Sequence, residues 1–155
     1  MTDLPSETAI SRTAAQIFDI VIDLAHQDRW LEESSAYKGT TLISAHPAQL
    51  GTTYREEGPL GVRNGVVVEF DPPTHILFSQ PMTLKWRLGT LGVAVRYTLT
   101  DHGGQTHVRR VCTLQVPRHL TPLQPILVRA FRIESARTLA ALKAYAEGAG
   151  GPPIA

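Results

Sequence analysis

The 155-residue chain has the length of one domain, with 43% hydrophobic and 19% charged residues. With a formal net charge of +1, it lacks the basic excess of nucleic-acid-binding proteins, so we expect no nucleic-acid partner. No apolar run approaches the ~20 residues of a membrane helix, so we expect no integral membrane association. The first ten residues lack the features of a signal peptide, and the single Cys112 precludes an intrachain disulfide. We therefore expect a cytoplasmic protein.

The first part of the chain predicts a short strand followed by two helical segments. Residues 6–12 favour the strand. Thr13 is a typical N-cap, because its hydroxyl can accept a backbone N–H of the next turn. Apolar residues such as Phe18 then recur at helical spacing. A second short helix or turn is expected over residues 25–34, with Trp30 in the core.

From Tyr37 onward the apolar residues recur at every second position, which predicts strands separated by glycine and proline. The connections are too short for parallel crossovers, so neighbouring strands should be antiparallel. A long helix should begin between Leu120 and Pro125 and end near Glu147. This order predicts one α+β domain over residues 1–147, followed by a flexible Gly/Pro-rich tail over 148–155. The expected strands are 37–45, 51–58, 62–71, 75–80 running on towards 88, 92–101 and 106–116.

Five segments add a family resemblance to this pattern: TAAQIFDIVIDLAHQDRW, LGTTYREEG, VVVEFDPPTHILFSQ, VAVRYTLTDHGGQTHV and ESARTLAALKAYAE. In this order and spacing they resemble the START-like, or SRPBCC, superfamily and its polyketide cyclase/dehydratase-like family. The resemblance implies the Bet v 1-like helix-grip fold. That fold has a curved seven-stranded antiparallel sheet, two short helices between strands 1 and 2, and a long C-terminal helix over a cavity. Some members carry hydrophobic ligands, whereas others catalyse cyclisation, aromatisation or dehydration, so the function must be argued from the cavity residues.

Strand alternation predicts which side chains face that cavity. The inward set is mostly apolar and aromatic, with a few polar groups, as is typical of a small-molecule pocket. A one-residue bulge would invert the assignment of any strand. The predicted ligand-binding residues are Tyr97, Trp86, Phe78, Gln80, Val68, Phe70, Val95, Leu127 and Phe131.

The segment HVRRVCTLQV, residues 107–116, contains an arginine pair of which only one member should point inward. Arg110 shares the parity of the apolar residues, and Arg109 lies on the wetter face. A buried guanidinium without a partner costs several kcal/mol, by order of magnitude. Glu56 and Glu134 are the carboxylates on facing elements, so we predict that Arg110 pairs with one of them. Such a pair is either structural or catalytic.

Metal and nucleophile chemistry find little support in the sequence. The six histidines form neither HExxH nor any other ligand motif, and CxxC is absent, so we expect no metal and no cofactor. Cys112 is interpreted as a small buried hydrophobe. Basic residues near the last helix favour a solvated face; the alternative is a contact with an acidic partner, a membrane surface or nucleic acid. These residues are Arg118, His119, Arg129, Arg132 and Arg137.

The sequence therefore predicts a protein that binds a hydrophobic small molecule in its cavity. The leading hypothesis is a polyketide cyclase/dehydratase-like enzyme in which Arg110 polarises a substrate carbonyl. Glu56, Glu134 or Tyr54 would move the proton. For Tyr54 and Tyr97 the favoured interpretation is nevertheless that of wall residues, because a tyrosine has a pKa of about 10 unless perturbed. The first alternative is a non-catalytic carrier or sensor of a lipid, quinone or aromatic metabolite. The second is a protein-interaction module with an incidental cavity. A monomer or a homodimer fits each hypothesis.

Overall fold

The computed structural model describes residues 1–34 and 37–148 of the chain. Within these ranges eight strands form one antiparallel sheet in the order β1-β8-β7-β5-β4-β3-β2, with β6 pairing with both β4 and β7. The strands are β1 (Thr2–Ile10), β2 (Thr40–Thr41), β3 (Thr53–Glu57), β4 (Gly61–Asp71), β5 (His75–Ser79), β6 (Met82–Leu84), β7 (Thr90–His102) and β8 (Gln105–Gln115). The helices are α1 (Ala14–Val21), η1 (Leu24–Arg29), η2 (Lys85–Arg87), η3 (Arg118–Leu123) and α2 (Gln124–Glu147).

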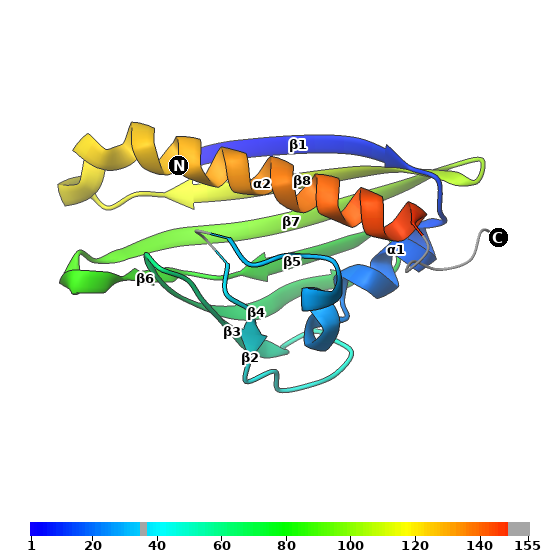
Figure 1. Cartoon of the computed structure of the whole chain (residues 1–155), viewed down its shortest axis with the longest axis horizontal. Helices are drawn as coiled ribbons and strands as arrows, with labels where there is room; N and C mark the ends of the chain where they lie inside the picture. The colour runs from blue at the N-terminus through cyan, green and yellow to red at the C-terminus, as the bar shows by residue number, and fades with distance from the viewer. Residues whose placement is uncertain (35–36, 149–155) are drawn as a thin grey trace.

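The predicted α+β helix-grip architecture is confirmed. Two short helices, α1 and η1, follow β1, and the long helix α2 lies along the sheet (Figure 1). There are eight described strands instead of seven, because the segment expected as one long strand is divided into β5 and β6 around Pro81. The predicted tail lies outside the described residues except for Gly148.

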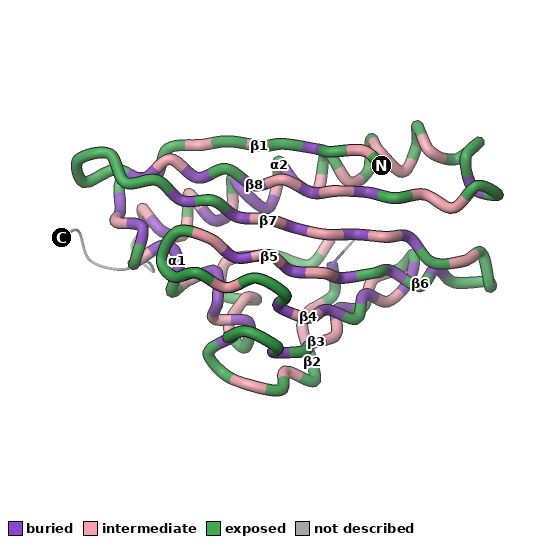
Figure 2. The backbone as a smooth tube through the Cα atoms, turned by 180° about the vertical axis from the view of Figure 1, so that it is seen from behind, coloured by how far each residue is buried: buried purple, intermediate pink, exposed green. Residues whose placement is uncertain are grey.

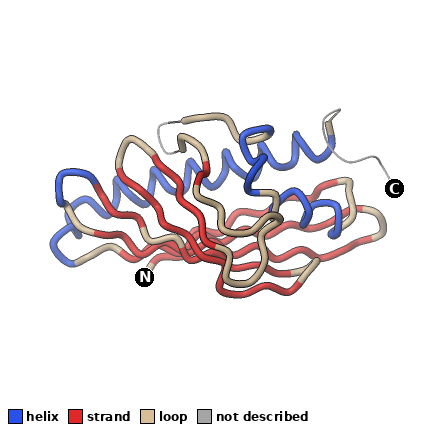
Figure 3. Tube along the Cα trace, turned by 90° about the horizontal axis from the view of Figure 1, so that it is seen from below, coloured by secondary structure: helices blue, strands red, loops and turns tan. Residues whose placement is uncertain are grey.

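Helix α2 covers one side of the sheet, where it packs mainly on β1 and β8 (Figure 3). Pro125 stands in its first turn, where the missing N–H costs no helical hydrogen bond. Its buried side chains recur at spacings of three and four residues, which places them on one face; they are Ser135, Thr138, Leu139, Leu142 and Ala146. Along the central strands, buried positions alternate with more exposed ones, as Figure 2 shows for β5, β7 and β8.

Helix α1 begins at a capping box, as the predicted N-cap implied. The Thr13 hydroxyl accepts the backbone N–H of Gln16 at 3.2 Å, and the Gln16 side chain accepts the N–H of Thr13 at 3.1 Å. Asp101, in β7, also accepts the N–H of Ala14 at 3.0 Å. These bonds satisfy the first donors of α1 and tie it to the sheet, which sets the position of η1 beyond it.

A β-bulge in β4 inverts the predicted parity of that strand. The register with β5 shifts between Val67 and Glu69. Before the bulge Val67 is buried, whereas Val68 is 44% exposed and does not face the cavity. After the bulge Phe70 packs on Phe18 of α1, with ring centroids 5.6 Å apart. Val68 therefore faces away from the cavity, against the prediction, because the extra residue of the bulge reverses the alternation before it. Phe70 has the predicted inward side but packs on α1, outside the cavity lining.

Gly65 of β4 supplies the space for a cavity aromatic ring. It lies opposite Tyr54 of β3, and a Cβ at position 65 would come within 2.1 Å of the Tyr54 ring. We expect Gly65→Ala to lower the free energy of unfolding by about 1–3 kcal/mol, because the ring must move out of a packed position. Asn64→Ala, at the exposed neighbouring position, should change it by less than about 0.5 kcal/mol. Urea denaturation measures both, and equal effects would contradict this steric reading.

Candidate functional site

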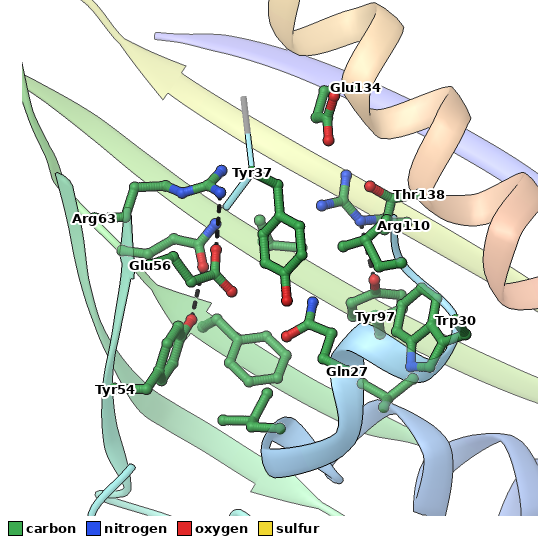
Figure 4. Close-up of a pocket in the computed structure, with 16 residues that line it drawn as sticks. Gln27, Trp30, Tyr37, Tyr54, Glu56, Arg63, Tyr97, Arg110, Glu134 and Thr138 are labelled. Atoms are coloured by element: carbon green, nitrogen blue, oxygen red, sulfur yellow. Dashed lines mark hydrogen bonds and ion pairs between the residues drawn. The ribbon is translucent and has the colours of Figure 1, made fainter. Parts of the chain in front are cut away.

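A cavity lies between the sheet, the α1–η1 segment and α2 (Figure 4). It has a volume of about 60 Å³. Its walls combine aromatic, aliphatic and charged side chains from both ends of the chain. The lining residues are Val21, Leu24, Gln27, Trp30, Leu31, Tyr37, Tyr54, Glu56, Arg63, Phe78, Gln80, Val95, Tyr97, Arg110, Glu134 and Thr138.

Arg110 projects from β8 into this cavity and is 9% exposed. Its Nε donates to the hydroxyl of Tyr97 at 3.1 Å, and its Nη1 donates to the hydroxyl of Ser135 at 2.6 Å. Burial lowers the pKa of Arg110, but the neighbouring Tyr97 and Cys112 more than offset this, so the pKa lies above its ordinary value. The guanidinium is therefore charged at every physiological pH.

The predicted pairing of Arg110 with Glu56 or Glu134 is wrong. Among the described residues, no carboxylate lies within ion-pair distance of Arg110. Glu56 instead binds Arg63, and Glu134 binds Arg137. Each carboxylate pairs with an arginine that the secondary structure places beside it. Arg63 lies opposite Glu56 across the β3–β4 hairpin, and Arg137 lies about one helical turn after Glu134.

The Glu56–Arg63 ion pair closes the β3–β4 side of the cavity. The two residues are direct partners in the register, their side chains are 8% and 10% exposed, and Arg63 Nη2 lies 2.9 Å from Glu56 Oε2. The hydroxyl of Thr40 donates to the other Glu56 oxygen at 3.3 Å. Strand alternation missed Arg63, because the bulge in β4 inverts its parity. The short loop around Gly58 could have predicted this position, because a tight hairpin there pairs Arg63 with Glu56.

Glu134 contributes a second carboxylate from α2. Its Oε1 accepts from Nη1 of Arg137 at 2.8 Å, and the Ser34 hydroxyl lies 3.4 Å from both carboxylate oxygens. In Figure 4 Glu134 and Thr138 stand on the side of Arg110, and the Glu56–Arg63 pair stands on the opposite side.

Tyr54 and Tyr97 flank Phe78 on the floor of the cavity. Each pair of neighbouring rings meets edge to face, with centroids 5.9 Å and 6.4 Å apart. The Tyr54 hydroxyl donates to Gln80 Oε1 at 2.6 Å. Burial, and then the charge of Glu56, raise the pKa of Tyr54 well above its ordinary value. Tyr54 is therefore a protonated donor at neutral pH.

The structure brings the predicted polar residues to one cavity but leaves several predicted apolar residues elsewhere. Trp86 is 77% exposed in η2, where its φ of +58° takes it out of the strand alternation that predicted it. Leu127 and Phe131 are partly buried against the core but lie outside the cavity lining, because α2 lines it with Glu134 and Thr138. The roles of the lining residues toward a ligand remain predictions.

Several lining residues were not predicted, because they lie in short or irregular segments. Gln27, Trp30 and Leu31 come from η1 and its end, and Tyr37 precedes β2. Trp30 was expected in the core; it is half-buried and lines the cavity. No helical period assigns faces in η1, and the strand expected over 37–45 is confined to Thr40–Thr41, so its alternation does not place Tyr37.

The match to a family model decides the relationship of this chain to known proteins. Residues 1–147 match the model described as polyketide cyclase/dehydrase and lipid transport. The chain belongs to this family. No functionally curated protein matches the chain. No described helix has the length and apolar character to cross a membrane.

Solved structures with the same fold share little sequence with this family member. The Aha1 dimer from Colwellia psychrerythraea is 16% identical, with a TM-score of 0.68 over 97% of this chain and 98% of that one. A conserved protein from Geobacillus kaustophilus is 12% identical, with a TM-score of 0.71 over 92% and 93%. DynU16, from the dynemicin biosynthetic locus, is 17% identical, with a TM-score of 0.66 over 97% of this chain and 48% of that one. At these identities the likeness shows the fold alone.

The buried Glu56–Arg63 pair predicts a large effect of Arg63→Met. The nearly isosteric methionine would leave the Glu56 carboxylate buried with one weak hydroxyl donor, so we expect a loss of about 3–5 kcal/mol in the free energy of unfolding. Arg55→Met is the matched control, because Arg55 pairs with the exposed Glu57 and should cost about 1 kcal/mol or less. Chemical denaturation measures the two, and a small effect of Arg63→Met would refute the ion pair.

The raised pKa of Tyr54 predicts an alkaline loss of stability. Above about pH 10 the unfolded chain ionises this tyrosine while the folded protein keeps its proton. The unfolded state then binds fewer protons, so the free energy of unfolding falls as the pH rises. Thermal denaturation across this range should show the wild type losing stability relative to Tyr54→Phe. Tyr145 lies outside the cavity lining, so Tyr145→Phe should lose stability with rising pH as the wild type does. If Tyr54→Phe loses as much stability, the raised pKa of Tyr54 is not the cause.

Proposed function

We propose that this protein binds a small hydrophobic molecule that carries a carbonyl or carboxylate oxygen, and that this oxygen contacts Arg110. The observation that carries the proposal is a buried guanidinium with neutral partners only. Tyr97 and Ser135 satisfy two of its nitrogens but cannot neutralise its charge. A buried charge of this kind is costly unless something of opposite charge or high polarity faces it.

The third nitrogen of Arg110 supports the same reading. Within residues 1–34 and 37–148, its Nη2 has no hydrogen-bond acceptor in the protein. Nη2 is also not fully buried. Among the described residues, Arg55 Nε is the one side-chain nitrogen or oxygen that is fully buried and has no hydrogen-bond partner. Nη2 is therefore available to a ligand oxygen, and a charge-assisted bond of this type contributes about 1.5–3 kcal/mol.

The shape of the cavity constrains the ligand. Its volume of about 60 Å³ is well below the roughly 300–1,000 Å³ of ordinary small-molecule pockets. At this volume it holds a few water molecules or a small fragment. A larger ligand must therefore displace lining side chains, and the Phe78 and Tyr97 rings offer flat surfaces for an aromatic or conjugated system.

The family supplies a reaction type for which the cavity holds suitable groups. We propose that Glu134 takes a proton from the carbon between two carbonyl groups of a polyketone. The enolate, with its oxygen bound to Arg110, attacks a second carbonyl of the same molecule and forms a carbon–carbon bond. The resulting alkoxide recovers the proton from Glu134, and loss of water completes the dehydration. The sequence balances without any oxidant or reductant.

A non-catalytic carrier is the second candidate, and one observation favours it. Both cavity carboxylates are already held by an arginine: Arg63 lies 2.9 Å from Glu56, and Arg137 donates to Glu134 at 2.8 Å. To take a proton from a substrate carbon, either carboxylate must turn a lone pair towards it, and its ion pair opposes this rotation. In a carrier the same contacts would simply hold the cavity wall in place.

Benzoate and benzyl alcohol test the anchoring role of Arg110, because they share a ring and differ in charge. NMR titration should place both in the cavity, and Arg110→Met should weaken benzoate binding roughly ten- to hundredfold while changing benzyl alcohol little. Arg109→Met removes a charge from the exposed face of the same strand and should leave both affinities unchanged. Equal losses of benzoate binding in the two variants would mean that Arg110 is not the anchor.

Glu134→Gln separates the enzyme from the carrier. With a linear polyketone thioester of N-acetylcysteamine, an enzyme should accelerate formation of the cyclised product, and Glu134→Gln should reduce that rate by about 10²-fold or more with binding retained. Glu57→Gln, at an exposed position, is the control. If the wild type binds the thioester and releases it unchanged, the carrier reading stands and the catalytic one fails.

A further inference from the structure

Asp23, His26 and His46 meet outside the cavity, next to the end of α1. One ligand atom from each residue lies within 4.8 Å of the other two. His26 Nδ1 is 2.9 Å from Asp23 Oδ1, and His46 Nε2 is 3.4 Å from the same oxygen. The rings of the two histidines are edge to face, with centroids 5.5 Å apart. We propose that these three side chains bind a divalent transition-metal ion of the Zn²⁺ type.

The spacing of the donor atoms fits such an ion. With metal–ligand bonds of about 2.0–2.1 Å, two donors of a tetrahedral site stand roughly 3.3 Å apart. Both distances to Asp23 Oδ1 lie close to this value. The two imidazole nitrogens lie within 4.8 Å of each other, so they must approach by at most about 1.5 Å to share an ion. Two imidazoles and a carboxylate form a donor set for zinc, copper or nickel ions, whereas magnesium and calcium prefer oxygen ligands alone.

The backbone holds the three residues in place before any ion arrives. Asp23 and His26 share one turn, which the His26 N–H closes by donating to the Asp23 carbonyl at 3.2 Å. His46 comes from a distant loop, which is anchored where the Ala48 N–H donates to the Ile22 carbonyl at 2.9 Å. Ala48 is buried, so this anchor lies within the core.

The position of the cluster leaves room for further ligands. Asp23 and His26 are half-buried and His46 is exposed, so water can complete the coordination. Asp23 and His26 also border a surface hollow of about 220 Å³ that includes Trp30. A bound ion would tie η1, which carries cavity residues, to the loop before β3. This assignment is independent of any ligand in the central cavity.

The alternative is that Asp23 simply accepts hydrogen bonds from the two imidazoles. Metal uptake distinguishes the two readings when the protein carries no affinity tag and is first stripped with a chelator. In equilibrium dialysis against Zn²⁺, the wild type should retain one ion per chain, and its melting temperature should rise with the Zn²⁺ concentration. Mg²⁺ should produce neither effect.

His46→Gln and Asp23→Asn should each abolish this equimolar uptake, while His102→Gln, at an exposed histidine in the β7–β8 hairpin, should retain it. The ring-nitrogen NMR signals of the wild type provide a test without mutation, because Zn²⁺ should shift the signals of His26 and His46 and leave those of the other histidines unchanged. No uptake by the wild type, uptake unchanged in His46→Gln, or shifts confined to other histidines would each overturn the proposal.

Discussion

Two arginines share one largely buried cavity, and the way each is compensated governs the properties of the site. Arg63 faces Glu56 at 2.9 Å, so the two charges cancel where the β3–β4 hairpin closes the wall. Arg110 has the hydroxyls of Tyr97 and Ser135 as partners. Because hydroxyl groups satisfy N–H donors without neutralising a guanidinium, the cavity retains one positive site. That site defines what the cavity can bind: a molecule with an oxygen that bears full or partial negative charge.

Hairpin register places both arginines. Tyr97 and Arg110 are direct partners across β7 and β8, just as Glu56 and Arg63 are across β3 and β4. Cross-strand neighbours on one face of a sheet lie within reach of each other, so each arginine finds a polar group without any loop rearrangement. Helix α2 adds Ser135 to the Arg110 contacts. The polar groups thus stand on regular elements, which favours a site that is organised before a ligand arrives.

An anchor for a carrier and an oxyanion contact for a cyclase would use the same guanidinium. The difference lies in whether a carboxylate can leave its present partners and reach a substrate carbon. Glu134 is better placed for this than Glu56, because it is the direct neighbour of Ser135, which binds Arg110, and because its Ser34 contacts are long at 3.4 Å. The small volume of about 60 Å³ makes side-chain displacement part of either function for a ligand that is to be enclosed.

Much of the fold followed from local patterns in the sequence. The Thr13 cap, the alternation that buries Arg110 and exposes Arg109, and the extent of the last helix all depend on residues close together in the chain. Local periodicity and capping chemistry therefore predicted them. The α+β order and the apolar and aromatic character of the cavity wall were predicted on the same basis.

The tertiary structure alone decided the features that depend on residues far apart or on a single irregular step. Because of the bulge after Val67, Arg63 faces the cavity and Val68 does not. One inserted residue is enough for this, since it inverts a period of two. The nearest partner of each carboxylate depended on distances that no spacing rule supplies. His46 lies beside Asp23 because of the fold of a loop that has no periodic pattern, so the sequence did not predict the cluster of Asp23, His26 and His46. Local chemistry thus determined the elements and their faces, and three-dimensional proximity decided which charges meet.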